Sequence, residues 1–278
     1  MLNKFNEKVT IITGGGAGLG KELCVQLAKL GSIVFVADIN DNNAKQVANS
    51  ILQSGGKAHP IRVDVSNEKE VKALIDEAVT KYGRLDYIFN NAGIAIGGDA
   101  RDITLQQWQK VLSVDLCGSI YCSAYAYQVM TKQGFGHIIN TASGTGLLPQ
   151  PGNAPYCTCK HGVVGLSLSL RYEGADLGVK VSTICPGRVK TDIFKSSIVV
   201  NVSDEYVSNN ISVKAMDVSK AVDIILNGVS HNKAIIVFPF SIRLVWFINR
   251  LFPRLLEPAW IKAIQNLRKF RKEYPHNI

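Results

Sequence analysis

The stretch TGGGAGLG, residues 13–20, decides the fold of this chain. A β-branched run at Val9–Ile12 precedes it and an amphipathic pattern over 19–30 follows it, so the glycines lie in a turn between a strand and a helix. Glycines there let the backbone turn tightly and approach a pyrophosphate, whose charge is stabilised at the helix N-terminus. Any tight turn favours glycine, but this strand–turn–helix context predicts a dinucleotide-binding loop. The residues assigned to it are Gly14, Gly18, Leu19 and Gly20.

On either side of this turn, short β-branched runs alternate with longer amphipathic stretches. The predicted buried strands are Val9–Ile12, Ile33–Ala37, Leu85–Phe89, His137–Asn140, Val179–Ile184 and Ala234–Phe238, with a weaker one near Ile61–Val63. The predicted helices lie at about 19–30, 42–54, 67–82, 104–132, 154–176 and 217–229. Alternation at this spacing favours right-handed βαβ units. We therefore predict an α/β fold, a Rossmann-type doubly wound parallel sheet of about seven strands with helices on both faces.

The second predicted strand ends in Asp38, eighteen residues past Gly20. A carboxylate at this place can accept hydrogen bonds from the hydroxyls of an adenosine ribose, and it repels a 2′-phosphate. No lysine or arginine lies in the glycine loop before Gly20 or in the three positions after Asp38. The sequence therefore favours NAD over NADP. The alternative is that Asp38 only caps the helix that begins near Asn42.

A third motif can carry chemistry. Tyr156 and Lys160 are four residues apart on a predicted helix, so their side chains share a face. A nearby ammonium favours tyrosinate and lowers the pKa of the phenol, which makes Tyr156 an acid or base nearer neutral pH. Ser143, at the end of the preceding predicted strand, could hold a carbonyl oxygen or donate to it. Tyr-x-x-x-Lys alone occurs by chance in many helices, so the pair indicates a catalytic site only in combination with the other motifs.

Together these motifs resemble those of the short-chain dehydrogenases/reductases over about residues 6–240. The matching features are TGGGAGLG (13–20), Asp38, Asp64-Val65, NNAG (90–93), Ser143, Tyr156-x-x-x-Lys160 and PGRVKT (186–191). The resemblance implies an oxidoreductase that moves a hydride between NAD(H) and a secondary alcohol or ketone, with Tyr156 passing the proton. It also implies a homodimer or homotetramer.

The same resemblance assigns further residues to the cofactor. Asp64 and Val65 would hold the adenine, and Asn91 and Gly93 belong to the segment that would wall the cofactor cleft. Val189 and Thr191 would fix the nicotinamide carboxamide. Lys160 would also bond the nicotinamide ribose, so the motif pair Tyr156 and Lys160 counts for both catalysis and cofactor binding.

The chain departs from that family at Asp115, where relatives usually carry asparagine, and we include this residue in the candidate catalytic set. The family's asparagine is thought to act largely through its main-chain carbonyl, which the change to aspartate keeps. A carboxylate near Lys160 would partly neutralise the field of the ammonium at Tyr156 and raise the pKa of the phenol. The alternative is that Asp115 points away and caps local backbone.

The rival interpretations are weaker. A dinucleotide sensor or scaffold protein with the same fold and little turnover would have no need to retain Ser143, Tyr156 and Lys160 together. A nucleic-acid-binding role would rest on the net charge of +9 alone, without a recognition motif. The substrate depends on the loops 94–102, 144–153 and 192–210, and their apolar residues favour a hydrophobic carbonyl compound. These residues are Leu147, Leu148, Ile193, Phe194 and Ile198.

The basic charge belongs to the C-terminal segment. Residues 241–278 contain eight basic and two acidic side chains, a net +6 of the total +9, so we divide the chain into one catalytic domain (1–240) and a C-terminal helical appendage (241–278). Arg243, Arg250 and Arg254 fall on one helical stripe, and Pro253 and Pro258 should break the appendage into short helices. Packing over the substrate cleft or a partner subunit is the first interpretation. Peripheral contact with a membrane surface is the second.

Composition limits the remaining classes. With 46% hydrophobic and 19% charged residues, wholesale disorder is excluded. The six cysteines have no zinc-ligand spacing, so we predict no metal site, and scattered free thiols favour a reducing, cytoplasmic compartment. Residues 1–10 lack the apolar core of a signal peptide, and Pro239, Ser241 and Arg243 interrupt the apolar run 234–248, so no transmembrane helix is predicted.

Overall fold

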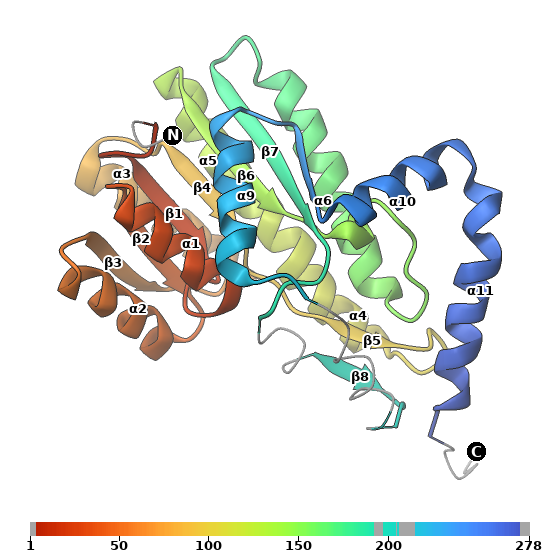
Figure 1. Ribbon diagram of the computed structural model, residues 1–278. Helices are drawn as coiled ribbons and strands as arrows, with labels where there is room; N and C mark the ends of the chain where they lie inside the picture. The colour runs from red at the N-terminus through yellow and green to blue at the C-terminus, as the bar shows by residue number, and fades with distance from the viewer. Residues whose placement is uncertain (1–3, 192–196, 204, 206–214, 273–278) are drawn as a thin grey trace.

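The computed structural model describes residues 4–191, 197–203, 205 and 215–272. Seven parallel strands form one sheet in the order β3-β2-β1-β4-β6-β7-β9 (Figure 1). The strands are β1 Val9–Thr13, β2 Ile33–Asp38, β3 Lys57–Arg62, β4 Tyr87–Asn90, β6 Gly136–Thr141, β7 Val179–Pro186 and β9 Ile235–Phe238. The helices are α1 Gly18–Lys29, α2 Asp41–Gln53, α3 Glu68–Tyr82, α4 Leu105–Val111, α5 Gly118–Gln133, α6 Ala154–Glu173, α9 Val218–Ser230, α10 Phe240–Leu251 and α11 Pro253–Lys269. The predicted doubly wound parallel sheet of seven strands is confirmed, and so are the predicted helices at the C-terminal end of the chain.

Helices cover both faces of the sheet. One apolar cluster joins the sheet to α1, α2 and α9, and a second joins it to α3 and α5. The central strands are buried on both faces, as the all-buried β1 (VTIIT) illustrates, and this is why they read as continuous apolar runs. The strand order reverses between β1 and β4, and ligands of such sheets bind at that point, outside the carboxyl ends of the strands.

The edge strand β3 was the least well predicted. It begins at Lys57 and ends at Arg62, whereas the sequence indicated only a weak strand near 61–63. Only Ala58 is buried along it, its other residues are exposed or half-buried, and Pro60 lies within it. Proline is tolerated in a sheet on an edge strand, where one side of the backbone has no ladder partner. Because polar side chains interrupt this edge strand, its sequence lacks the apolar run by which the other strands were predicted.

The predicted helix over 104–132 is one helical rod with an irregular centre. Its α4 and α5 segments are joined by the π-helical turn η2 Leu112–Cys117. Such a turn carries one extra residue and changes which side chains point inward. Asp115 lies in the middle of it and is fully buried.

The helices α10 and α11 divide the C-terminal segment differently from the prediction. Pro253 starts α11, a position where its missing N–H costs no hydrogen bond. Pro258 lies inside α11 and does not end it, so the expectation of a second break was wrong. Pro258 lies on the exposed side of α11. Because the break precedes Arg254, the predicted arginine stripe is divided between two helices. Among the described residues, no helix has the length and apolarity needed to cross a bilayer.

Candidate active site

The glycine loop turns from β1 into α1 at the switch point of the sheet. Gly14 and Gly18 adopt positive φ angles of 63° and 51°, which side chains disfavour. A Cβ at Gly14 would lie 2.9 Å from Ala92 Cα, and one at Gly20 would lie 2.0 Å from the Gly14 carbonyl oxygen. The loop must therefore be glycine-rich, and it leaves the N-terminus of α1 open to an anion.

Asp38, the last residue of β2, faces this loop. Its Oδ2 accepts a hydrogen bond from Gly16 N at 2.9 Å, and its Oδ1 accepts one from Asn40 N at 2.9 Å. The cap of α2 is Asn40, whose side chain accepts from Asn43 N at 3.1 Å. The helix-capping role that the sequence analysis considered as the alternative for Asp38 therefore belongs to Asn40. Asp38 itself borders the central cavity.

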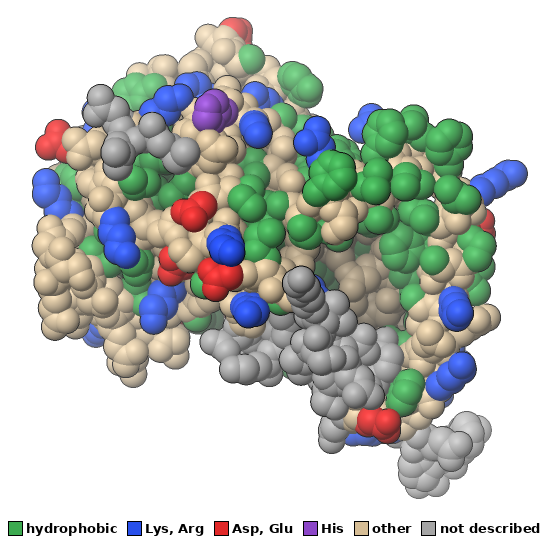
Figure 2. All heavy atoms as spheres, in the orientation of Figure 1, with side chains coloured by type: hydrophobic (Ala, Val, Ile, Leu, Met, Phe, Trp, Pro, Cys, Tyr) green, Lys and Arg blue, Asp and Glu red, His purple; other side chains and the backbone are tan. Residues whose placement is uncertain are grey.

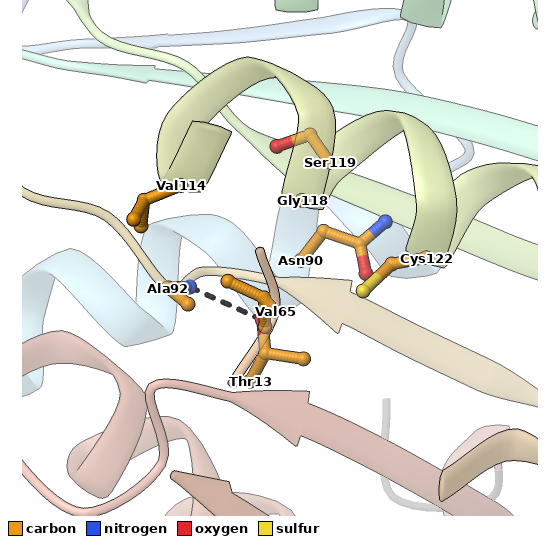
Figure 3. A pocket seen from close by; sticks show the side chains of 8 residues that line it. All are labelled: Thr13, Val65, Asn90, Ala92, Val114, Gly118, Ser119 and Cys122. Atoms are coloured by element: carbon orange, nitrogen blue, oxygen red, sulfur yellow. Dashed lines mark hydrogen bonds between the residues drawn. The ribbon is translucent and has the colours of Figure 1, made fainter. Parts of the chain in front are cut away.

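The segment after β4 is fixed to β1 by Thr13. The hydroxyl oxygen of Thr13 accepts hydrogen bonds from Asn91 N at 3.0 Å and Ala92 N at 3.1 Å. Figure 3 shows the second bond beside a small pocket that Val65 and Gly118 also line. A Cβ at Gly118 would lie 2.9 Å from Val65 Cγ2, so the Val65 side chain packs directly against the backbone of Gly118. The two hydrogen bonds to Thr13 hold the NNAG segment in place.

The proton-transfer candidates lie where β6 ends and α6 begins. Ser143 follows β6 and caps a short 3₁₀ turn, η3 Gly144–Gly146, by accepting from Thr145 N at 3.3 Å. Lys160 Nζ lies 5.2 Å from the ring centroid of Tyr156 and donates to the Thr141 carbonyl oxygen at 3.1 Å. Lys160 is buried, whereas Tyr156 keeps part of its surface open to the cavity. The predicted sharing of one helix face by Tyr156 and Lys160 agrees with these distances.

Asp115 points at Lys160 rather than away from it. Its Oδ2 lies 3.0 Å from Lys160 Nζ, and its Oδ1 accepts a hydrogen bond from Ile94 N at 2.8 Å. The two groups form a buried ion pair. The main-chain carbonyl of Asp115 accepts from the Ser119 hydroxyl at 2.8 Å. The π-helical turn thus places the carboxylate of Asp115 next to Lys160 in the candidate site.

The buried pair of Asp115 and Lys160 shifts the pKa values of Lys160 and of Tyr156. Burial alone would lower the pKa of Lys160, but the negative charges of the Asp115 carboxylate and of the Tyr156 tyrosinate outweigh it and raise this pKa to about 12. Burial raises the pKa of Tyr156, the ammonium of Lys160 lowers it, and the charge of Asp115 raises it again, so the net shift is upward. The ammonium therefore acts on the phenol in the predicted direction, and Asp115 opposes it.

These residues border one cavity of about 770 Å³, a size that suits a cofactor and a small substrate. Of the residues singled out in the sequence, it brings together Gly14, Gly18, Leu19, Asp38, Asn91, Gly93, Asp115, Ser143, Tyr156, Lys160, Val189 and Thr191. Gly20, Asp64 and Val65 do not border it. Asp64 instead accepts hydrogen bonds from the backbone and hydroxyl of Ser66, so the adenine role of Asp64 and Val65 stays a prediction.

The far end of the cavity is built by loops and by the C-terminal helices. Strands β5 Ile96–Gly98 and β8 Ile198–Val200 pair in a small second sheet that the sequence did not predict. Leu148 and Ile198 border the cavity as expected, but Leu147 packs beside it, and Ile193 and Phe194 lie outside the described residues. The sequence also did not assign the side chains that α10 and α11 contribute, namely Ile242, Trp260, Ala263 and Leu267.

Two ion pairs hold the end of α11 over this cavity. Arg268 Nε lies 2.7 Å from Asp99 Oδ2, and Arg271 contacts Asp102 at 2.6 Å. Hydrogen bonds from Arg101 and Arg268 outweigh burial and hold the pKa of Asp99 well below its usual range. Of the two interpretations of the C-terminal segment, packing over the cleft therefore describes the end of α11.

The comparisons with known proteins agree with this geometry. The family model described as short chain dehydrogenase matches residues 8–202. Cyclohexanol dehydrogenase of Acinetobacter sp. (strain SE19) is 37% identical over 195 residues, which cover 69% of this chain and 77% of that protein. Meso-2,3-butanediol dehydrogenase of Serratia marcescens is 34% identical over 190 residues, 68% of this chain and 74% of that protein.

A solved structure extends the likeness of the fold to almost the whole chain. A short-chain dehydrogenase/reductase from Burkholderia phymatum, solved in complex with NAD, superposes with a TM-score of 0.84 over 99% of both chains. The two sequences are only 23% identical, so this likeness concerns the fold alone.

Proposed function

Because the chain belongs to the short-chain dehydrogenase family, we propose that it transfers a hydride between NAD(H) and a secondary alcohol or ketone of a small hydrophobic molecule. One observation carries the proposal. The Tyr156–Lys160 pair and Ser143 border the same cavity as the glycine loop and Asp38, so a dinucleotide on the loop would bring its reactive ring toward the phenol.

The residues present fit a dinucleotide. The positive φ angles of Gly14 and Gly18 expose backbone at the N-terminus of α1, where a Cβ would obstruct a pyrophosphate. Asp38 would accept hydrogen bonds from the adenosine ribose. Val189 and Thr191, which also border the cavity, would hold the nicotinamide carboxamide. When bound, NAD would supply the hydride acceptor for the alcohol carbon.

The protein's own part in the reaction is proton transfer. In the oxidation of an alcohol, the carbon loses a hydride to the cofactor while the hydroxyl proton passes to the tyrosinate of Tyr156. Ser143 would hold the substrate oxygen beside the phenol. The ammonium of Lys160 lowers the pKa of Tyr156, which makes the basic form more accessible. In the reverse direction Tyr156 donates the proton and a ketone becomes the alcohol.

The apolar part of the cavity wall supports the proposed substrate class. Leu148, Ile242, Trp260 and Leu267 present mostly apolar surface to the cavity. Relatives are named for the oxidation of cyclohexanol and of butanediol. Both features favour an uncharged secondary alcohol over a phosphorylated compound.

The direct test is turnover. Purified protein is mixed with NAD⁺ and a panel of cyclic, linear and aromatic secondary alcohols, and NADH absorbance is followed; the ketones are tested with NADH. We expect at least one apolar secondary alcohol to be oxidised, with a Tyr156→Phe control that is inactive. NADH binding without turnover of any panel member in either direction would favour the sensor interpretation instead.

Asp38 predicts the choice of cofactor. Its carboxylate should make NADH bind more tightly than NADPH, because a 2′-phosphate beside it is repelled and the ribose hydrogen bonds are not made. Exchanging Asp38→Ser together with Ile39→Arg should relax or invert the preference, since Ile39 is exposed and has room for the longer side chain. Fluorescence titration with both cofactors measures the ratio of dissociation constants.

The matched control for this pair is Asp41→Ser, which removes an exposed carboxylate from the first turn of α2 outside the cavity. It should leave the ratio unchanged. Tighter NADPH than NADH binding by the unaltered protein would contradict the role of Asp38.

A further inference from the structure

The helices α10 and α11 have an outer face that stays exposed among the described residues. Phe240, Leu244, Phe247 and Leu251 recur at i, i+4, i+7 and i+11 along α10, so they share one face, and they are 47–74% exposed. Phe252 and Leu255 continue this surface at the turn into α11, with exposed fractions of 63% and 67%. We call these six residues the hairpin face. Figure 2 shows hydrophobic side chains gathered over these two helices.

The hairpin face is not part of the core that stabilises the domain. None of the residues of α10 is buried, and in α11 only Leu267 is. Single exposed apolar residues are common on soluble proteins, but a contiguous group of this size marks a contact site. The cavity side of the two helices uses other residues, such as Ile242 and Trp260, so the hairpin face is free for a separate role.

Exposed basic side chains lie on the same two helices as this apolar surface. Arg243 and Arg250 project from α10, Arg254 and Lys262 from α11, and all four are exposed. Within the described part of the chain, none of the four has a recorded ion pair. Glu257 is the single acidic residue of α10 and α11. The partner of the hairpin face must therefore accept apolar side chains and offer negative charge around them.

We propose that the hairpin face binds peripherally to the surface of a bilayer that contains anionic phospholipids. The aromatic and leucine side chains would enter the boundary between headgroups and acyl chains, while the four basic residues contact the phosphates. An amphipathic helix that lies in the plane of the membrane needs only such a face and need not span the bilayer.

The charge pattern disfavours the other occupants. A two-fold contact with a second copy would place the hairpin face against itself, with the basic residues of both copies on the same interface. A nucleic acid would meet phenylalanine and leucine side chains at the centre of the patch, where no phosphate contact forms. An anionic bilayer offers both chemistries at once.

Vesicle co-sedimentation of the full chain tests the proposal. Vesicles of phosphatidylcholine alone are compared with vesicles containing about 30% phosphatidylserine, at salt concentrations from about 50 to about 500 mM. The unaltered protein should bind the anionic vesicles at least about tenfold more tightly and should be released as salt rises, because the attraction is screened.

Two variants separate the contributions. Phe240→Ser with Phe247→Ser should abolish most binding to both kinds of vesicle. Arg243→Gln, Arg250→Gln and Arg254→Gln together should weaken binding to the anionic vesicles by about a hundredfold at low salt, since each basic residue contributes about fivefold. The control for the apolar variant is Leu105→Ser with Tyr172→Ser, at two residues that are exposed elsewhere on the molecule. The control for the basic variant removes three exposed lysines on other helices and strands, by Lys29→Gln, Lys57→Gln and Lys132→Gln. Both controls should bind as the unaltered protein does.

Circular dichroism establishes that each variant is folded, and sedimentation velocity reports the oligomeric state. Absence of binding to both kinds of vesicle would overturn the proposal. So would equal binding by the unaltered protein and the Phe240/Phe247 variant. A dimer that dissociates in that variant, together with no vesicle binding, would assign the hairpin face to a second copy.

Discussion

Replacing Tyr156 by phenylalanine should lower kcat by about 10²–10⁴-fold, the range typical of a general acid or base. The ring packs beside Ile96, Val111 and Cys159, and phenylalanine preserves this packing, so only the transferable proton is lost. The affinity for NADH should change little. Steady-state kinetics with the best alcohol of the panel, together with a fluorescence titration of NADH, measures both quantities.

Tyr172→Phe is the matched control, because Tyr172 lies on the same helix α6 but is 75% exposed and outside the cavity. It should keep full activity. If Tyr156→Phe retained more than a tenth of kcat, another group would have to transfer the proton. A large loss of NADH affinity would mean instead that the hydroxyl supports the bound cofactor.

The central fold could be predicted because its signals are local. The strands β1, β2, β4, β6 and β7 are buried on both faces and read as short β-branched runs, and the loop 13–20 marks the switch point. Edge strand β3 gave a weak signal because only one of its residues, Ala58, is buried. The small sheet of β5 and β8 joins segments about a hundred residues apart, and its strands have only three residues each. Pairing at such a distance leaves no periodicity in the sequence.

In the candidate site, too, residues close together in the sequence could be predicted, whereas residues brought together by long-range contacts could not. Tyr156 and Lys160 lie on one helix, so their spacing alone placed them together. The wall formed by Trp260 and Leu267 depends on contacts such as Arg268 with Asp99, which are 169 residues apart. Nothing near Asp99 in the sequence indicates this partner. The end of α11 packs over the cavity, whereas the proposed membrane contact would concern the outer face of α10 and the start of α11.

The pairing of Asp115 with Lys160 leads to a second large effect. Asp115→Ala would leave the buried ammonium of Lys160 without its counter-charge, and breaking a buried pair in this way typically costs about 3–5 kcal/mol of stability. Urea unfolding near neutral pH, followed by circular dichroism, measures the loss. Ser119→Ala is the matched control, because it removes only the neutral hydrogen bond to the Asp115 carbonyl, worth about 1 kcal/mol.

The stability difference should depend on pH in a defined direction. In the unaltered protein the pKa of Lys160 is raised from 10.5 to about 12, so its stabilising effect is fully present below 10.5 and is lost as pH rises through 12. Without Asp115, burial lowers the pKa of Lys160, and the charged form becomes unfavourable below 10.5. The difference between Asp115→Ala and the unaltered protein should therefore be largest near neutral pH and shrink toward pH 12. A difference independent of pH would assign the loss to packing alone.

Asp115→Asn separates charge from shape, because the amide keeps an acceptor for the Ile94 N–H and removes the negative charge. Asp115 touches neither substrate nor cofactor in this scheme and acts through Lys160, so it is a positioning residue. Since its charge raises the pKa of Tyr156, its removal should lower that pKa. Alcohol oxidation uses the tyrosinate, so the rising limb of kcat/KM should move to lower pH, by a fraction of a unit, with activity retained. Superimposed pH profiles would mean that the carboxylate has no influence on Tyr156. Loss of activity in a folded Asp115→Asn protein would mean that the carboxylate is needed at the site, either in proton transfer or to keep Lys160 charged, because the amide keeps the Ile94 contact but removes the counter-charge of Lys160.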